Sequence, residues 1–241
     1  MDLDSLRLLQ TQILQRLSEL EACMLPSGQQ QHSNISPTLY QQGKAEEDEE
    51  DNENIHHCTT MESRISHILR SGGVGDFEFK RVPSDYYERS LEERRDIVGA
   101  PSIDHLCKSI VLTNTQAHAS VTDCSDPKNS KYYVVVIQYT ARLNAENVKN
   151  FLHTLNNGKI PKKKFNLRLA PEEESSKLTG YEHNAVTPIG MKTDIPVILD
   201  QAITRLQRDF FWLGGGEVDL KLGINTSQFI NFIKPFLVNC S

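Results

Sequence analysis

The sequence predicts an α+β fold, with a mixed, partly antiparallel β-sheet and flanking helices, preceded by an N-terminal helix and a disordered linker. Three observations lead to this expectation. Strand-like and helix-like segments follow one another irregularly from residue 59 onward, several strands occur in succession near the C-terminus, and residues 26–58 contain almost no apolar side chains. A regular alternation of strands and helices would instead predict a doubly wound parallel sheet.

The first segment, residues 1–25, is predicted to be an amphipathic helix. Its apolar side chains recur at intervals of three and four, with one glutamine completing the series: Leu3, Leu6, Gln10, Ile13, Leu17, Leu20 and Met24. A stripe of about three heptads is close to the shortest that forms a coiled coil. The segment therefore either self-associates as a coiled coil or packs against its own domain, and the pattern leaves both open.

Residues 26–58 are predicted to form a disordered acidic linker. The segment begins with a stretch rich in Gln, Ser and Pro and continues into the acidic run from Ala45 to Glu53. It cannot bury enough apolar surface to offset the chain entropy lost on folding. We interpret the acidic run as solubilising, with a specific binding partner as the rarer alternative. The chain is thus divided into residues 1–25, residues 26–58 and a folded domain over 59–241.

Caps and apolar runs mark the elements in the first half of this domain. A capping box at Thr59–Glu62 predicts a helix through Leu69. A second box at Ser90–Glu93 predicts a helix ending near Gly99, and Asn144 is expected to cap a third helix. Alternating or continuous apolar runs predict strands over 77–82, 108–113 and 132–140.

The second half is richer in strands. Pro171, followed by three glutamates, predicts a short helix through Leu178, because proline suits the first turn and acids suit the N-terminus. The chain is expected to close with a helix over 227–237. Strands are predicted over 164–170, 195–199, 210–213 and 218–224.

Composition argues against several classes of protein. No apolar run approaches the roughly 20 residues that span a bilayer, and no basic region followed by an apolar block indicates secretion. The five cysteines are widely spaced and form no C-x-x-C pair, so we expect a reducing, cytoplasmic compartment and no zinc site. The net charge of −6 counts against a nucleic-acid partner, but it arises mainly from the acidic run.

Three segments could carry chemistry. Lys108 opens an apolar strand, where a lysine either faces a cleft or snorkels to water from the strand end. Residues 178–191 form a loop that either binds a ligand through its backbone N–H groups or simply connects two elements. Asp200 follows an apolar strand and is either a helix N-cap or an acid at the mouth of a cleft.

In their order along the chain, these segments resemble the YbaK/prolyl-tRNA-editing family of aminoacyl-tRNA deacylase domains. The pattern of that family is a lysine-led strand, a segment L-x-x-A-x-x-E, then T-G-Y with a loop ending in P-[FI]-G, a strand ending in Asp, and a glycine-rich turn. The matching pieces are Lys108–Leu112, Leu167–Glu174, Thr179–Tyr181, Pro188–Gly190, Val197–Asp200 and Leu213–Gly216. The resemblance covers roughly residues 75–238 and includes none of residues 1–58.

The resemblance implies hydrolysis of the aminoacyl ester at the 3′ end of mischarged tRNA, with water as nucleophile and with no cofactor or metal. It implies that Lys108 is catalytic, as a cationic donor to the phosphate or carbonyl end of the substrate. The implied substrate-binding residues are Thr179, Gly180, His183, Asn184, Ala185, Val186, Thr187, Pro188, Gly190, Asp200, Gly214 and Gly215. The implied partners are tRNA and an aminoacyl-tRNA synthetase, and no membrane is involved.

The loop departs from the family at one place. Two adjacent positions that are commonly glycine are Asn184 and Ala185 here. Asn tolerates left-handed backbone better than most residues, whereas Ala does so poorly. The pocket is therefore expected to differ or the activity to be reduced. A deacylase-like interaction module of the translation machinery and an esterase for a small metabolite stay open as alternatives.

A basic run over 159–164, comprising Lys159, Lys162, Lys163 and Lys164, is the remaining feature of interest. It either meets the tRNA backbone or forms an ordinary solvated turn.

Overall fold

The computed structural model describes residues 60–241. The helix predicted over 1–25 and the linker predicted over 26–58 lie outside the described residues, so that part of the domain division stays a prediction. Within the described part, no helix is both long and apolar enough to cross a bilayer. The elements are α2 (Met61–Ser71), β1 (Phe77–Arg81), α3 (Leu91–Val98), β2 (Cys107–Asn114), β3 (Tyr132–Gln138), α4 (Ala145–Leu155), β4 (Leu167–Leu169), α5 (Glu172–Thr179), β5 (Val197–Asp200), β6 (Phe210–Gly214), β7 (Leu220–Asn225), α6 (Thr226–Ile233) and β8 (Phe236–Val238), with short 3₁₀ turns η1 (Tyr86–Glu88), η2 (Ile103–His105), η3 (Lys162–Lys164), η4 (Ile203–Arg205) and η5 (Gln207–Asp209).

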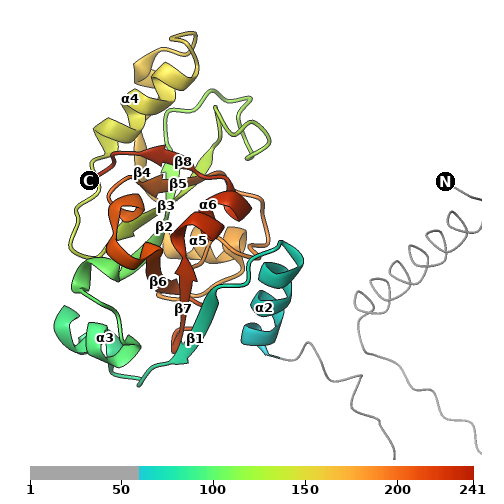
Figure 1. Cartoon of the computed structure of the whole chain (residues 1–241). Helices are drawn as coiled ribbons and strands as arrows, with labels where there is room; N and C mark the ends of the chain where they lie inside the picture. The colour runs from blue at the N-terminus through green and yellow to red at the C-terminus, as the bar shows by residue number, and fades with distance from the viewer. Residues whose placement is uncertain (1–59) are drawn as a thin grey trace, which may run out of the picture. The chain divides into compact units, whose positions relative to one another are not determined.

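The strands form two sheets (Figure 1). The larger sheet has the order β4-β2-β3-β5-β8, in which β2 pairs antiparallel with β3 and β4, whereas the β3–β5 and β5–β8 pairs are parallel. The smaller sheet, β1-β7-β6, is antiparallel throughout. The predicted α+β fold with a mixed, partly antiparallel sheet is therefore confirmed, and the predicted strands are divided between two sheets.

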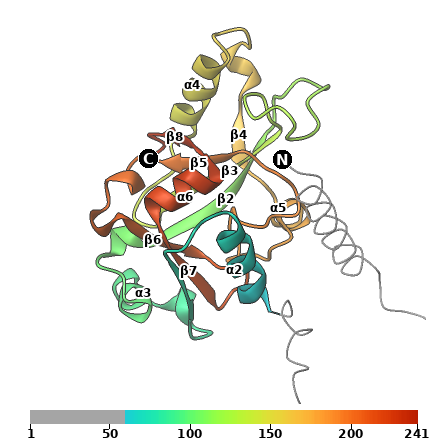
Figure 2. The same cartoon turned by 45° about the vertical axis from the view of Figure 1, so that its right-hand side comes forward.

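Strand β3 separates two hydrophobic cores. Successive side chains of a strand point to opposite faces. Val134 and Val136 face the core shared with the smaller sheet, α2 and α6, whereas Tyr133 and Val135 face the core beneath α4. Figure 2 shows α4 at one end of this part of the chain and α3 at the other. Because both faces are covered, β3 is an almost continuous apolar run rather than an alternating one.

The predicted caps of α3 and α4 are confirmed. Ser90 and Glu93 form a reciprocal capping box at the start of α3, and Gly99 closes that helix with a left-handed φ of 70°. Asn144 accepts hydrogen bonds from two backbone N–H groups in the first turn of α4. Each cap satisfies backbone groups that the helix itself leaves unpaired.

Several boundaries differ from the prediction: among the strands, the one predicted over 164–170 is shortened to Leu167–Leu169, because Lys162–Lys164 form a 3₁₀ turn. Helix α2 is capped by Thr60, whose side chain accepts from the Ser63 N–H, one residue later than expected. The helix predicted over 227–237 ends early, because Lys234 has a left-handed φ of 53° and Pro235 cannot continue a helix. The chain after it forms β8, which extends the larger sheet.

Candidate active site

A cavity of about 320 Å³ opens where β2 and the start of α5 meet the end of β6 and the 183–186 loop. Since β2 and β6 belong to different sheets, the cavity lies where the two sheets adjoin. It is lined by Tyr87, Cys107, Lys108, Ser109, Ile110, Val111, Tyr139, Leu169, Ala170, Glu172, Ser175, Ser176, His183, Asn184, Val186 and Gly214. Of the residues predicted from the sequence, Lys108, His183, Asn184, Val186 and Gly214 therefore come together.

Lys108 reaches the cavity from the second position of β2. Its side chain is half-buried, and its Nζ lies 5.4 Å from the centroid of the Tyr139 ring. Within residues 60–241, no carboxylate lies within ion-pair distance of it. A half-buried ammonium whose one close partner is an aromatic face retains donors for a ligand. The cleft alternative for Lys108 is thus the one that the geometry supports.

Tyrosine rings and cations form the wall beside Lys108. The Arg94 guanidinium lies over the rings of Tyr86, Tyr87 and Tyr139 at 5.4–5.6 Å. The Lys221 Nζ lies 4.5 Å from the Tyr87 ring centroid, and burial lowers the pKa of Lys221 to about 8. Burial raises the pKa of Tyr87 and of Tyr139, so both phenols keep their protons at neutral pH.

In the loop that contains residues 184 and 185, the left-handed backbone conformation occurs at one residue and not at both. Asn184 has a left-handed φ of 66°, as a glycine at that position would, and its carbonyl accepts from the Tyr87 hydroxyl at 2.6 Å. Ala185 is fully buried and is not among the residues with positive φ. The expected difficulty at Ala185 is therefore wrong: the left-handed conformation falls on Asn184, which tolerates it.

Hydrogen bonds fix the peptide planes of this loop. The Ala185 N–H donates to the Glu182 carbonyl at 3.0 Å, and the Ala185 carbonyl accepts from the Gly216 N–H at 3.1 Å. The next N–H, that of Val186, has no acceptor among residues 60–241. The backbone N–H groups of this loop were expected to bind the substrate. The Ala185 N–H is already hydrogen-bonded, whereas the N–H of Val186, which lines the cavity, is not, so Val186 is the better candidate donor.

Gly214 at the end of β6 allows the loop to approach. A Cβ at Gly214 would lie 2.6 Å from the Val186 carbonyl oxygen and 3.0 Å from that of Ala185. Both neighbours are backbone atoms, which cannot move aside as a flexible side chain can. The glycine-rich turn is therefore needed here for close backbone contact, and Gly214 has no positive φ to explain it otherwise.

Several predicted residues shape the loop without lining the cavity. Thr179 is buried; its hydroxyl donates to the Ser175 carbonyl and accepts from the Tyr181 N–H. Gly180 closes α5 with a φ of 78°, and Gly190 has a φ of 67° and accepts from Arg64 at 2.6 Å through its carbonyl.

The remaining predicted residues are also buried away from the cavity. Thr187 and Pro188 lie inside the loop, and the Gly215 N–H donates to Leu220 across the β6–β7 turn. Asp200 is fully buried at the end of β5, where one carboxylate oxygen lies 3.4 Å from the Ala202 N–H. Asp200 is therefore closer to a cap of the following turn than to an acid at a cleft mouth.

The cavity also contains residues that the sequence analysis missed. Glu172, Ser175 and Ser176 share one face of α5, a spacing that could have revealed them once the helix was assigned. The His183 Nδ1 and Glu172 Oε2 are 4.0 Å apart, and both side chains are exposed. Tyr87 carried no local signal. Cys107 lines the cavity too, but burial raises its pKa well above the usual value, so its thiol stays protonated.

The Ser109 hydroxyl and the arrangement of possible metal ligands are the last two features of the site. The Ser109 hydroxyl has no hydrogen-bond partner within the described part of the chain, although it is buried and belongs to the cavity lining. Among residues 60–241, no group of His, Cys, Asp and Glu side chains is arranged to hold a metal ion.

The family model of the aminoacyl-tRNA editing domain matches residues 89–232, which is more than half of the chain. The chain belongs to the aminoacyl-tRNA editing domain family. The match contains Lys108, the loop and Gly214, but it begins after Tyr87. Of the residues that line the cavity, Tyr87 alone lies outside the matched region.

Solved structures share the fold of this editing domain. A candidate trans-editing enzyme for prolyl-tRNA synthetase is 19% identical with a TM-score of 0.57, covering 76% of this chain and 98% of its own. A scaffold from computational epitope grafting is 16% identical with a TM-score of 0.56, covering 76% and 97%. A hypothetical protein is 19% identical with a TM-score of 0.54, covering 73% and 98%. No curated protein matches the chain.

Proposed function

We propose that this editing domain hydrolyses, in trans, the ester bond of mischarged tRNA. The observation that carries the proposal is that one cavity is lined both by Lys108 and by Val186, a loop residue whose backbone N–H is unpaired within residues 60–241. Neither group has a competing partner within residues 60–241. Two free donors on residues that line one cavity suit a substrate that develops negative oxygen during the reaction.

The reaction is the addition of water to the ester carbonyl, followed by cleavage of the bond between that carbon and the ribose oxygen. The products are a free amino acid and a tRNA with its terminal hydroxyl restored. The carbonyl oxygen becomes an oxyanion in the intermediate, and a donor aimed at it typically contributes about 3–4 kcal/mol. Val186 is assigned to this oxyanion, and Lys108 to the oxyanion or the adjacent phosphate.

Proton transfer does not require a strongly perturbed side chain in this scheme. The family resemblance assigns assistance to the terminal ribose hydroxyl of the substrate itself. His183 and Glu172, at the mouth of the cavity, are the side chains that could relay the proton to solvent. Cys107 is not assigned as a nucleophile, because its thiol is protonated.

An exposed basic segment next to β4 is consistent with tRNA as the substrate. Lys162 and Lys163 are exposed on η3, directly before β4. Arg168 on β4 is exposed as well, and its neighbour Leu169, at 67% exposed, lines the cavity. Exposed cations on this segment can contact phosphates of the tRNA backbone.

The decisive experiment measures deacylation by the full chain of a panel of tRNAs, each charged with a cognate or a noncognate amino acid. We expect at least one mischarged tRNA to be hydrolysed well above the uncatalysed rate. Hydrolysis of free aminoacyl esters alone would identify a metabolite esterase. Binding to tRNA or to a synthetase without hydrolysis would identify a non-catalytic interaction module.

A further inference from the structure

We propose that Tyr87 and Lys221 are positioning residues that hold the turn of residues 184–186 in the conformation that leaves the Val186 N–H open to the substrate. The inference rests on the proposed function for its catalytic part only. Its structural part, that these two side chains fix the loop, stands on the hydrogen bonds between them.

The contacts form a directed chain. The single hydroxyl proton of Tyr87 is donated to the Asn184 carbonyl at 2.6 Å, so the phenol oxygen must accept in its other interactions. The Lys221 Nζ donates to that oxygen at 2.8 Å. An ammonium can only donate, and therefore it keeps the phenol proton directed toward Asn184. Hydrogen bonds in such a series strengthen one another in a buried setting.

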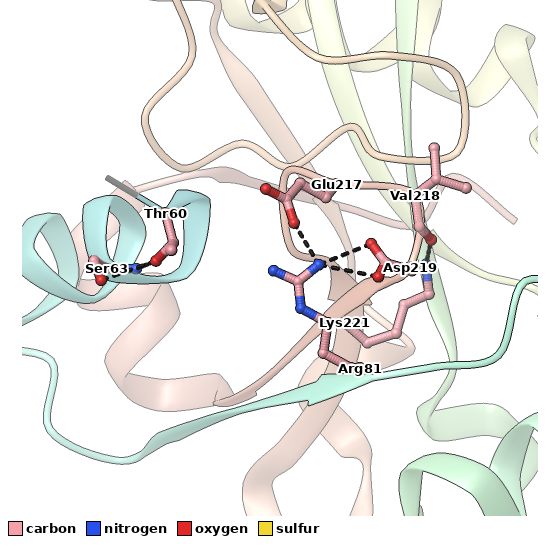
Figure 3. A network of polar contacts seen from close by, with 7 residues as sticks. All are labelled: Thr60, Ser63, Arg81, Glu217, Val218, Asp219 and Lys221. Carbon is pink, nitrogen blue, oxygen red and sulfur yellow. Dashed lines mark hydrogen bonds and ion pairs between the residues drawn. The ribbon is translucent and has the colours of Figure 1, made fainter. Parts of the chain in front are cut away.

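Lys221 is itself held from several sides. Its Nζ donates to the Val218 carbonyl at 2.7 Å and lies over the rings of Tyr86 and Tyr87. Figure 3 shows Lys221 reaching Val218 beside the cluster in which Arg81 bridges two acids of the same turn. Lys221 is only 4% exposed, and its backbone is the partner of Gly214 in the β6–β7 pairing. Lys221, which contacts Tyr87, and Gly214, which lies against the loop, are therefore held next to each other by the sheet.

The position of the Asn184 carbonyl determines which backbone groups of the next two residues are hydrogen-bonded and which are free. With this carbonyl held by Tyr87, the Ala185 N–H on the same peptide plane reaches Glu182, and the following carbonyl reaches Gly216. Val186 is then left with an unpaired N–H within the described part of the chain. Glycine would adopt this conformation readily, whereas Asn does so less easily. The Tyr87–Lys221 pair thus stabilises a turn whose left-handed residue is an asparagine.

The test uses two variants and two matched controls in the full chain. Y87F removes the hydroxyl and keeps the ring, and K221M removes the ammonium and keeps the length of the side chain. Y86F is the control for the first, because Tyr86 contacts the same Lys221 but its hydroxyl makes no hydrogen bond to residues 60–241. K80M is the control for the second, because Lys80 is the cross-strand neighbour of Lys221 and its Nζ also donates to a carbonyl and lies over an aromatic ring, but it makes no hydrogen bond to Tyr87 or to residues 184–186.

Two readouts are measured for each protein. The first is hydrogen exchange of the Gly216 amide, which reports the bond to Ala185, with the amides of β3 as an internal reference. Y87F and K221M should exchange about fivefold to tenfold faster at Gly216 and unchanged in β3, as expected for the loss of one hydrogen bond. The second is steady-state deacylation, where kcat should fall about tenfold or more with little change in KM for tRNA.

Each result decides the proposal. Normal Gly216 exchange in both variants, or equal effects in Y86F and K80M, would overturn it. Faster exchange with an unchanged kcat in an active enzyme would also overturn it, since the turn would then be held without serving catalysis. If the wild type hydrolyses no tRNA, the proposed function fails, but the exchange data still show whether Tyr87 and Lys221 hold the loop.

Discussion

Replacing Gly214 by alanine should impair the site more than the fold. The added methyl would lie 2.6 Å from the Val186 carbonyl oxygen, whereas ordinary contacts begin at 3.4 Å. The β6 backbone and the loop must therefore separate by about 0.8 Å, the difference between these distances. Because the displaced atoms belong to Val186, the donor assigned to the oxyanion moves with them.

G214A is expected to have a moderate effect on stability and a large effect on the rate. Overpacking a buried site typically costs about 1–3 kcal/mol, which lowers the Tm of a domain of this size by roughly 2–10 °C. A displacement of nearly 1 Å at a catalytic group costs about 100-fold in rate. G214A should thus remain folded at room temperature, with a moderately lower Tm and a kcat/KM reduced by about two orders of magnitude.

The assay pairs thermal unfolding with deacylation of the best tRNA substrate, and G75A is the matched control. A Cβ at Gly75 would meet no atom within 4 Å, and its φ is ordinary. G75A should therefore change stability by less than about 0.5 kcal/mol and leave the rate unaltered. If G214A kept the wild-type Tm and rate, the close approach of β6 to the loop would not exist as described.

Four further predictions concern other parts of the chain. K108A should keep a normal Tm but lose about 100-fold or more in kcat/KM. K108R should not fully restore the rate, because a planar guanidinium does not replace a compact ammonium. Turnover by K108A at the wild-type rate would refute the assignment of Lys108 to the site. The charge reversal K162E/K163E should raise KM for tRNA, more so at low salt, and leave hydrolysis of a free aminoacyl ester unchanged; equal effects on both substrates would contradict an RNA role. Limited proteolysis should cut first within residues 26–58 and leave a stable C-terminal fragment; a fragment that unfolds on cutting would refute this division. If residues 1–25 self-associate, the full chain should sediment as an oligomer and a chain starting at Thr59 as a monomer. Monomer masses for both chains would rule out self-association.

The sequence determined those features that depend on near neighbours. The capping box of Ser90 and Glu93 and the cap at Asn144 are satisfied within one turn, so their residue types are sufficient to predict them. The apolar runs of β2 and β3 likewise follow from burial on one or both faces. Lys108 stands out because an ammonium that opens an apolar strand needs either a cleft or access to water, and the family resemblance favours the cleft.

Only the tertiary structure decided which side chains share the cavity. Tyr87 precedes the recognisable motifs, and it reaches the loop because η1 packs beside the end of β6, a contact between segments far apart in sequence. Asp200 matched its motif but was buried, because strand β5 lies inside the sheet between β3 and β8. The strain assigned to Ala185 falls on Asn184 instead, since hydrogen bonds from Tyr87 and Gly216 set the peptide planes. Such long-range contacts have no local signature, because the residues that make them are brought together by packing of the two sheets.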